Sequence, residues 1–259
     1  MKKVLLIVLV LILTNSCKKD DDPIPFTEGT VADIEGNVYK TIQIEIPTGG
    51  SKGFEATQSI TQTWMAENLK TTMYSNGDLI GTTTPATLDI YEDRYVLVNY
   101  QWAYGGNETN VDTYGRLYTW GAVTDNRNIC PTGWHVPTKA QWTRLAEFLG
   151  GEFVEDWEGT GRWSNVGSKL KEAGTAHWVS PNSDAVNSIG FTALPGGLRD
   201  FEYSIFSGIT SGGHWWSATE DGNRAYIWAW GYAAFSGTGR LSTTDYYANS
   251  GLSVRCIKD

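Results

Sequence analysis

The sequence predicts a loop-rich α+β domain in which two or three helices pack on small antiparallel sheets. Two observations lead to this prediction. The helix signals all lie before residue 174, whereas short strand patterns separated by Gly, Ser and Asn follow residue 190. The 259 residues include 29 glycines and 12 tryptophans, a composition typical of a loop-rich and aromatic-rich globular protein. Helices and strands that are segregated along a chain indicate the α+β class.

Composition and charge exclude several classes of protein. An aromatic content of 13% is too high for an intrinsically disordered chain, and no heptad pattern indicates a coiled coil. The net charge is −9, whereas nucleic-acid-binding proteins typically carry an excess of positive charge. We therefore expect one globular domain and no nucleic-acid partner.

The N-terminus resembles a bacterial lipoprotein signal. Two lysines precede the unbroken apolar run 4–13, which is too short to span a bilayer, and Leu-Thr-Asn-Ser-Cys follows. Because this ending resembles a lipobox, we expect a signal peptide over 1–16, lipidation of Cys17 and attachment to a membrane through the lipid. An ordinary signal peptide with a stray cysteine is the alternative.

A charged tether over 17–28 follows the expected lipidation site. Its Lys-Lys-Asp-Asp-Asp run and two prolines show no hydrophobic periodicity. The run also resembles the export signal of Bacteroidota surface lipoproteins, which implies an outer-membrane lipoprotein exposed at the cell surface. A solvated linker without export function is the alternative.

Two cysteines remain once Cys17 is assigned to lipidation. In an oxidising compartment an even pair predicts a disulfide between Cys130 and Cys256. Such a bond would tie the final strand to the middle of the chain. Two buried free thiols are the alternative.

The domain over 29–259 begins with a strand. The pattern of 37–45 predicts this strand, with Val38, Ile42 and Ile44 on one face. Glycine, proline and hydroxyl residues then predict an inserted loop over about 46–60.

Three helices are predicted in the middle of the chain. The clearest starts at Thr138, which can form a capping box with Gln141, and a Gly-Gly pair at 150–151 stops it. A second helix is predicted over 116–123 and a short third over 168–173. The side chains predicted to face the core are Leu117, Trp120, Trp142, Leu145, Ala146 and Leu149.

Strands are predicted at 215–216, 225–233 and 252–257. The second of these alternates small and aromatic residues, so its four aromatic side chains share one face. They are Tyr226, Trp228, Trp230 and Tyr232.

Eight motifs carry a family resemblance. They lie at 33–39, 63–69, 114–118, 130–137, 169–174, 190–197, 215–217 and 253–256. In this order they resemble the Fibrobacter succinogenes major paralogous domain of lipoproteins, over nearly everything from residue 29 onward. That family is similar to the C-type-lectin-like fold of formylglycine-generating enzymes, so the resemblance implies a C-type-lectin-like version of the α+β fold.

No cluster of residues indicates catalysis. The three histidines, His135, His177 and His214, show no metal-ligand spacing, and Gly-x-Ser-x-Gly, Walker and dinucleotide-binding motifs are absent from the sequence. The reactive cysteines of formylglycine-generating enzymes are not matched if Cys256 is in a disulfide. We expect no catalytic residue, no metal and no cofactor, with calcium at Glu220, Asp221 and Asn223 as the alternative.

The C-terminal region has the composition of a recognition surface. Tyr, Trp, Ser, Gly and Asn make up close to half of 199–251, and these residue types are favoured in binding loops. The alternative is that the tryptophans fill the core. The predicted ligand-binding residues are Arg199, Tyr203, Trp215, Asp221, Asn223, Arg224, Tyr246 and Tyr247.

These observations predict a non-catalytic surface lipoprotein that binds a glycan or a protein through its C-terminal region. A structural or adhesin-assembly component of the envelope is one alternative. A diverged oxidase of the formylglycine-generating type is another.

Overall fold

The computed structural model describes residues 24–48, 58–93, 95–156, 160–221 and 228–259. The expected signal peptide, Cys17 and most of the tether lie outside the described residues, as do Asn223, Arg224 and Tyr226. The side chains of Asp221, Trp228 and Trp230 are likewise outside this description. Among the described residues, no helix has the length and apolar character needed to cross a membrane.

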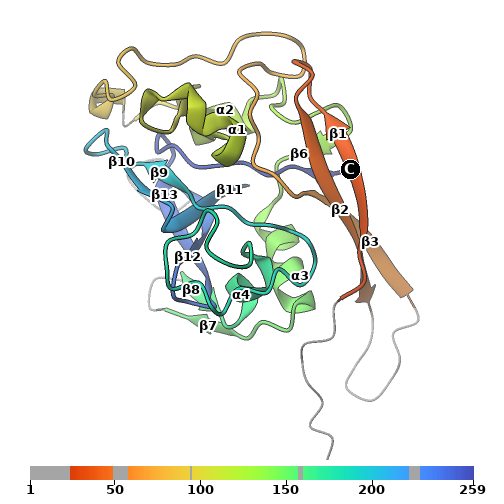
Figure 1. Cartoon of the computed structure of the whole chain (residues 1–259). Coiled ribbons are helices and arrows are strands. Elements are labelled where there is room, and N and C mark those ends of the chain that lie inside the picture. The colour runs from red at the N-terminus through yellow and green to blue at the C-terminus, as the bar shows by residue number, and fades with distance from the viewer. Residues whose placement is uncertain (1–23, 49–57, 94, 157–159, 222–227) are drawn as a thin grey trace, which may run out of the picture.

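Strands form most of the regular structure and are arranged in three sheets within the described residues (Figure 1). The five-stranded sheet has the order β1 (Thr27–Ala32), β2 (Val38–Thr48), β3 (Gln58–Met65), β14 (Ile257–Lys258) and β6 (Trp134–His135). The seven-stranded sheet has the order β10 (Phe206–Ile209), β9 (Gly196–Arg199), β11 (Gly212–Asp221), β12 (Trp228–Phe235), β13 (Leu241–Tyr247), β8 (Gly161–Trp163) and β7 (Phe153–Glu155). The third sheet pairs β4 (Gln101–Ala103) with β5 (Arg116–Tyr118).

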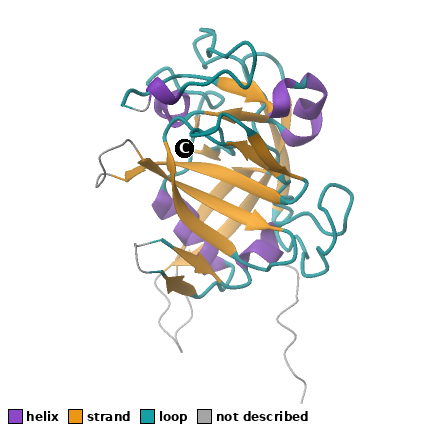
Figure 2. Ribbon diagram, turned by 90° about the vertical axis from the view of Figure 1, so that its left-hand side faces the viewer, coloured by secondary structure: helices purple, strands orange, loops and turns teal. Residues whose placement is uncertain are grey.

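The helices are short and lie around the strands (Figure 2). They are α1 (Val111–Tyr114), α2 (Trp120–Thr124), α3 (Lys139–Phe148) and α4 (Val166–Leu170), with 3-10 turns η1 (Tyr91–Asp93), η2 (Tyr104–Gly106) and η3 (Glu108–Asn110). The predicted α+β, C-type-lectin-like layout is therefore wrong: the described chain is mostly β, and one of its sheets forms a half-barrel.

The predicted helix over 116–123 shows why the helical content is lower than expected. Its first residues form β5, which pairs with β4, and the Tyr118 amide donates to the Leu252 carbonyl at 2.8 Å. Helix α2 begins only after this pairing, at Trp120. Long-range strand pairing therefore overrides the local helical pattern, although Leu117 and Trp120 are buried as predicted.

Helix α3 matches its prediction closely. The Thr138 hydroxyl accepts from the Gln141 amide at 3.3 Å, and Gln141 Oε1 accepts from the Thr138 amide at 2.8 Å, which completes the capping box. The four predicted core residues of this helix are all buried. The short helix α4 lies slightly earlier than the predicted 168–173.

The predicted loop over 46–60 is wrong at both ends, where strands β2 and β3 pair as a hairpin. Ile46 pairs with Ile60 and Thr48 with Gln58, so both strands extend into this segment, and residues 49–57 lie outside the description. Ile42 and Ile44 are buried as predicted, but Val38, on the same face of β2, is 60% exposed. At this end of the strand the buried side chain is Tyr39, on the opposite face.

Two large hydrophobic clusters form the core. The first centres on Trp142, whose ring lies 5.0 Å from that of Trp64 and 4.9 Å from that of Tyr232. The second contains the predicted disulfide between Cys130 and Cys256, which is confirmed and joins residues 126 apart in sequence. A small third cluster of Ile90, Trp102 and Phe201 lies apart from both.

Candidate functional site

Two of the predicted ligand-binding residues lie in the protein interior. Arg199, at the end of β9, has no exposed surface, and its guanidinium lies 4.4 Å from the centre of the Trp102 ring. Arg199 Nε donates to the Ala86 carbonyl at 3.1 Å and Nη2 donates to the Leu88 carbonyl at 2.7 Å. Burial lowers the pKa of Arg199 to about 10. In this position Arg199 holds residues 86–88.

Trp215 is buried as well, and its indole Nε1 donates to Asn68 Oδ1 at 2.9 Å. Tyr246 is half-buried as a residue, and its hydroxyl lies 2.8 Å from His214 Nδ1. Burial raises the pKa of Tyr246 and lowers that of His214 to about 4. These two groups form a neutral polar pair inside the seven-stranded sheet.

Tyr203 and Tyr247 reach a common surface. Tyr203 is 72% exposed, and the Tyr247 hydroxyl donates to Glu202 Oε1 at 3.1 Å. The Tyr247 ring lies 5.3 Å from that of Phe201, which in turn stacks on Tyr91 at 5.7 Å. The structure thus brings two predicted residues together with a segment from the first half of the chain.

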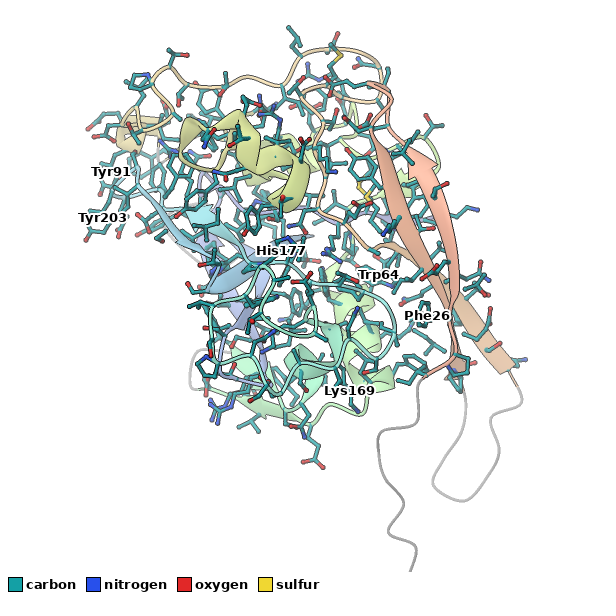
Figure 3. All side chains as sticks on the ribbon, viewed as in Figure 1. Phe26, Trp64, Tyr91, Lys169, His177 and Tyr203 are labelled. Atoms are coloured by element: carbon teal, nitrogen blue, oxygen red, sulfur yellow. A yellow bond between two sulfur atoms is a disulfide. The ribbon has the colours of Figure 1, made fainter. Side chains whose placement is uncertain are left out.

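We call this surface the aromatic face (Figure 3, near Tyr91 and Tyr203). Its exposed apolar side chains come from residues 88–97 and from the turn after β9. They are Leu88, Tyr91, Tyr95, Val96, Leu97, Tyr203 and Ile205. These side chains lie on two segments that meet where Tyr91 stacks on Phe201, and apolar side chains gathered at a surface are typical of an interaction site.

The aromatic face has an acidic border. Asp89 Oδ1 accepts from the Tyr91 amide at 2.8 Å, and Asp200 Oδ1 accepts from the Tyr203 amide at 2.9 Å. These bonds fix two carboxylates beside the exposed rings. In the sequence, the segments 88–97 and 200–205 carry five carboxylates and one arginine. The surface therefore favours a partner of positive charge.

Buried polar side chains hold residues 86–93 and 95–98 in place. Besides Arg199, the buried Asn249 donates from Nδ2 to the Asp93 carbonyl at 3.0 Å and to the Val96 carbonyl at 2.9 Å. Its Oδ1 accepts from the Val98 amide at 3.3 Å. The aromatic face is thereby positioned from the C-terminal part of the chain before any partner binds.

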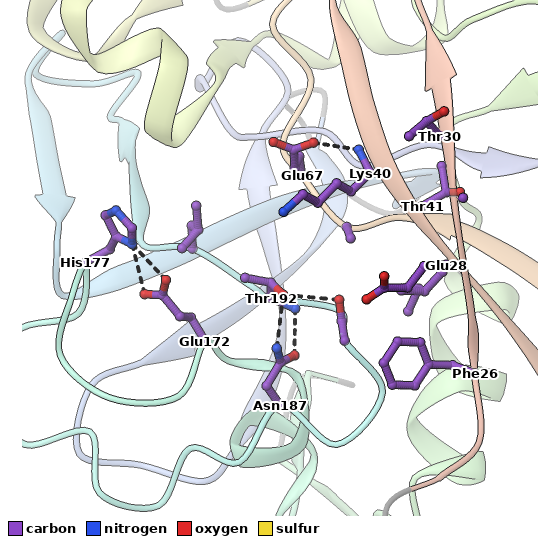
Figure 4. Close-up of a pocket in the computed structure, with 15 residues that line it drawn as sticks. Phe26, Glu28, Thr30, Lys40, Thr41, Glu67, Glu172, His177, Asn187 and Thr192 are labelled. Atoms are coloured by element: carbon purple, nitrogen blue, oxygen red, sulfur yellow. Dashed lines mark hydrogen bonds and ion pairs between the residues drawn. The ribbon is translucent and has the colours of Figure 1, made fainter.

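A second candidate site is a pocket of about 730 Å³ between the β1–β2 hairpin and residues 172–194 (Figure 4). We call it the hairpin pocket. Its hairpin wall carries Phe26, Glu28 and Lys40, and Glu67 lies above it. Glu67 Oε2 accepts from the Lys40 amide at 2.6 Å, which fixes this carboxylate at the edge of the pocket.

The opposite wall of the hairpin pocket is a set of hydrogen-bonded polar side chains. His177 Nδ1 lies 2.8 Å from Glu172 Oε1. Asn187 Oδ1 accepts from the Thr192 amide at 2.8 Å, and Asn187 Nδ2 donates to Thr192 Oγ1 at 3.0 Å. These bonds hold the wall in one arrangement.

Neither site has the ligands of a metal centre. Among the residues that the structure describes, no group of three or more His, Cys, Asp and Glu side chains could hold a metal ion. The alternative of a calcium site at Glu220, Asp221 and Asn223 stays a prediction, because Asn223 and the side chain of Asp221 lie outside the described residues.

Sequence reasoning missed residues 88–97 and the hairpin pocket. The first carries a recognisable signal, since tyrosines, leucine and valine alternate irregularly with carboxylates and fit neither a helix nor a strand. The pocket has no contiguous signal, because its walls are more than a hundred residues apart in sequence.

Comparison with known proteins identifies a family. A family model described as the Fibrobacter succinogenes major domain matches residues 60–258. No curated protein and no solved structure matches the chain significantly. The matched region contains the aromatic face and one wall of the hairpin pocket, whereas β1 and β2 precede it.

Proposed function

The chain belongs to the Fibrobacter succinogenes major domain family, and from this premise we propose that it is a non-catalytic binding protein that engages a basic protein partner through the aromatic face. The observation that carries the proposal is the fixed cluster of exposed tyrosines and aliphatic side chains beside bound carboxylates. Tyrosines at such a surface offer large, rigid contact area with little loss of conformational entropy.

The composition of the aromatic face favours a protein over a glycan. A sugar would stack on tyrosine rings and use the carboxylates for its hydroxyls. Leu88, Val96 and Ile205, however, provide no hydrogen bonds and suit the apolar side chains of a protein surface. Glycan binding is therefore the second outcome of the test rather than the proposal.

We further propose that the protein acts at the cell surface as an outer-membrane lipoprotein. The support comes from the sequence, in the apolar run 4–13, the Leu-Thr-Asn-Ser-Cys17 ending and the charged tether. A tether of this kind would leave the folded domain free to meet partners outside the cell.

Site-specific photo-crosslinking in the native host tests the proposal. A benzophenone amino acid replaces Tyr203 in one variant and Ile205 in a second, and a matched control carries it at the exposed Val154 of β7. We expect a discrete protein adduct from both face positions and none from the control. Binding of the identified protein should weaken at high salt and in a Tyr203→Ser variant.

Three results would overturn this function. They are adducts of equal yield from Val154, the absence of any adduct, and adducts with lipopolysaccharide or other glycans instead of protein. The last would favour a glycan-binding role for the same face. The absence of adducts from all three positions would favour the structural alternative.

A further inference from the structure

We infer that the hairpin pocket is a second binding site, separate from the aromatic face, and that it takes an amino-substituted saccharide. The two sites lie on opposite sides of the molecule, near Tyr203 and near Phe26 (Figure 3). A volume of about 730 Å³ lies within the usual range of small-ligand pockets and has room for a disaccharide.

The charges of the lining define the class of ligand. Three carboxylates, Glu28, Glu67 and Glu172, line the pocket together with the ammonium group of Lys40. Lys70 Nζ lies 3.9 Å from Glu67 Oε1, and His177 contacts Glu172, whereas the Glu28 carboxylate has no cationic partner among the ion pairs of the described residues. The Glu28 side of the pocket therefore favours a cation and opposes an anion. A protonated amine on the ligand would therefore find a carboxylate partner, whereas a uronic acid would be repelled.

The hydrogen-bonding groups favour hydroxyls on the rest of the ligand. Carboxylates accept hydrogen bonds and Lys40 donates them, while the hydroxyls of Thr30 and Thr192 do both. A sugar hydroxyl also does both, so it can satisfy either kind of group. Figure 4 shows Lys40 extending from β2 across the pocket toward the opposite wall, with the Glu28 carboxylate facing the same space.

Apolar contact comes from the hairpin side of the pocket. Phe26 is partly exposed at the pocket, and its ring packs closely over Gly190, where a Cβ atom would lie only 2.6 Å from Phe26 Cε2. Ile42 and Leu194 also line the pocket. A phenyl ring with aliphatic neighbours can pack on the apolar face of a pyranose ring, while the carboxylates accept hydrogen bonds from the hydroxyls of the sugar.

The hairpin wall sets the specificity. Phe26, Glu28 and Lys40 precede the region matched by the family model, whereas Glu172 and Asn187 lie within it. The pocket therefore combines a wall made by the family domain with a wall made by the preceding hairpin. Changes in the hairpin would alter the ligand without altering the domain.

Titration calorimetry of the full-length protein with three β-1,4-linked disaccharides tests the inference. They are a glucosamine disaccharide, neutral cellobiose and a disaccharide that contains glucuronate. We expect saturable binding of the first, binding about tenfold weaker for the second because one charge-assisted hydrogen bond is lost, and none for the third. Absence of binding by all three, or preference for the acidic sugar, would overturn the inference.

Variants of the hairpin locate the site. Glu28→Gln should weaken binding of the amino sugar about tenfold and leave cellobiose unchanged, because only the charge is removed. Phe26→Ala should weaken both. The matched control is Glu45→Gln, whose carboxylate lies on the opposite face of β2 and accepts from the hydroxyls of Ser59 and Thr61. Equal effects of Glu28→Gln and Glu45→Gln would place any binding elsewhere and overturn the assignment.

Discussion

Opening the Cys130–Cys256 disulfide should remove a large part of the stability of the fold. The bond joins residues 126 apart, and in the chain-entropy model a loop of this length raises the free energy of unfolding by about 5 kcal/mol at 25 °C. Both cysteines are buried in the second hydrophobic cluster, so they are within the packed core. For a chain of this size, about 5 kcal/mol corresponds to roughly 10–20 °C in Tm.

Denaturant unfolding with and without reductant measures this contribution. The reduced wild type keeps both sulfur atoms, so its loss of stability reports the crosslink alone. A Cys130→Ala, Cys256→Ala variant loses packing as well, and we expect about 1–2 kcal/mol of further destabilisation from the two vacated sites. If the reduced wild type is less than about 1 kcal/mol less stable than the oxidised protein, the loop-closure reasoning is refuted.

Three further predictions concern buried groups. Arg199→Met should lower stability by about 2–4 kcal/mol, because the Ala86 and Leu88 carbonyls lose their donors, and should speed hydrogen exchange in residues 86–98. Burial lowers the pKa of His214 to about 4, so between pH 6.5 and pH 4 the folded protein keeps this side chain neutral while the unfolded chain takes up a proton. About 3 kcal/mol of the stability present at pH 7 should therefore be lost as the pH falls from 6.5 to 4. His214→Gln should remove this part of the pH dependence of urea unfolding. Gly167→Ala would place a Cβ atom 2.1 Å from the Arg240 carbonyl oxygen and should lower Tm by at least about 4 °C in calorimetry.

The features predicted correctly from the sequence depend on few distant contacts. The capping box of Thr138 and Gln141 lies within one turn of chain, so its signal is complete in four residues. The disulfide followed from the number of cysteines and the expected compartment, and no other pairing was available once Cys17 was set aside. Neither prediction needed the topology of the sheets.

The wrong predictions concern segments whose structure is set by remote partners. Residues 116–118 become a strand because β4 and Leu252 supply hydrogen bonds, and no local pattern reveals them. The same is true of 46–48 and 58–60, which pair with each other across the hairpin. The fold class was wrong for this reason, since short segments of this kind add up to a mostly β chain.

Composition alone could not separate the predicted binding residues into interior and surface groups. Arg199 and Tyr203 are four residues apart, yet the first lies under Trp102 and the second is 72% exposed. Aromatic and glycine residues serve cores and binding loops equally well, so their enrichment in 199–251 predicted a region and not its exposed face. The segment 88–97 joins this surface through a tertiary contact, the stacking of Tyr91 on Phe201, which no local pattern in the sequence indicates.

The exposed Val38 and the hairpin pocket have a common origin in strand β2. Ile42, Ile44 and Ile46 cover the first core cluster with one face of this strand, whereas Tyr39 enters the second cluster from the other face. Lys40 lies on the same face as the three isoleucines and interrupts its apolar pattern. Strand β1 pairs with this part of β2 and places Thr30 opposite Lys40 and Glu28 opposite Ile42. At Lys40 this face of the strand therefore stops covering the first cluster, and the space between it and residues 172–194 is lined by charged and polar side chains together with Phe26, Ile42 and Leu194. A charged residue that breaks an apolar strand face is thus a signal in sequence for where a sheet stops covering a core and can start to line a site.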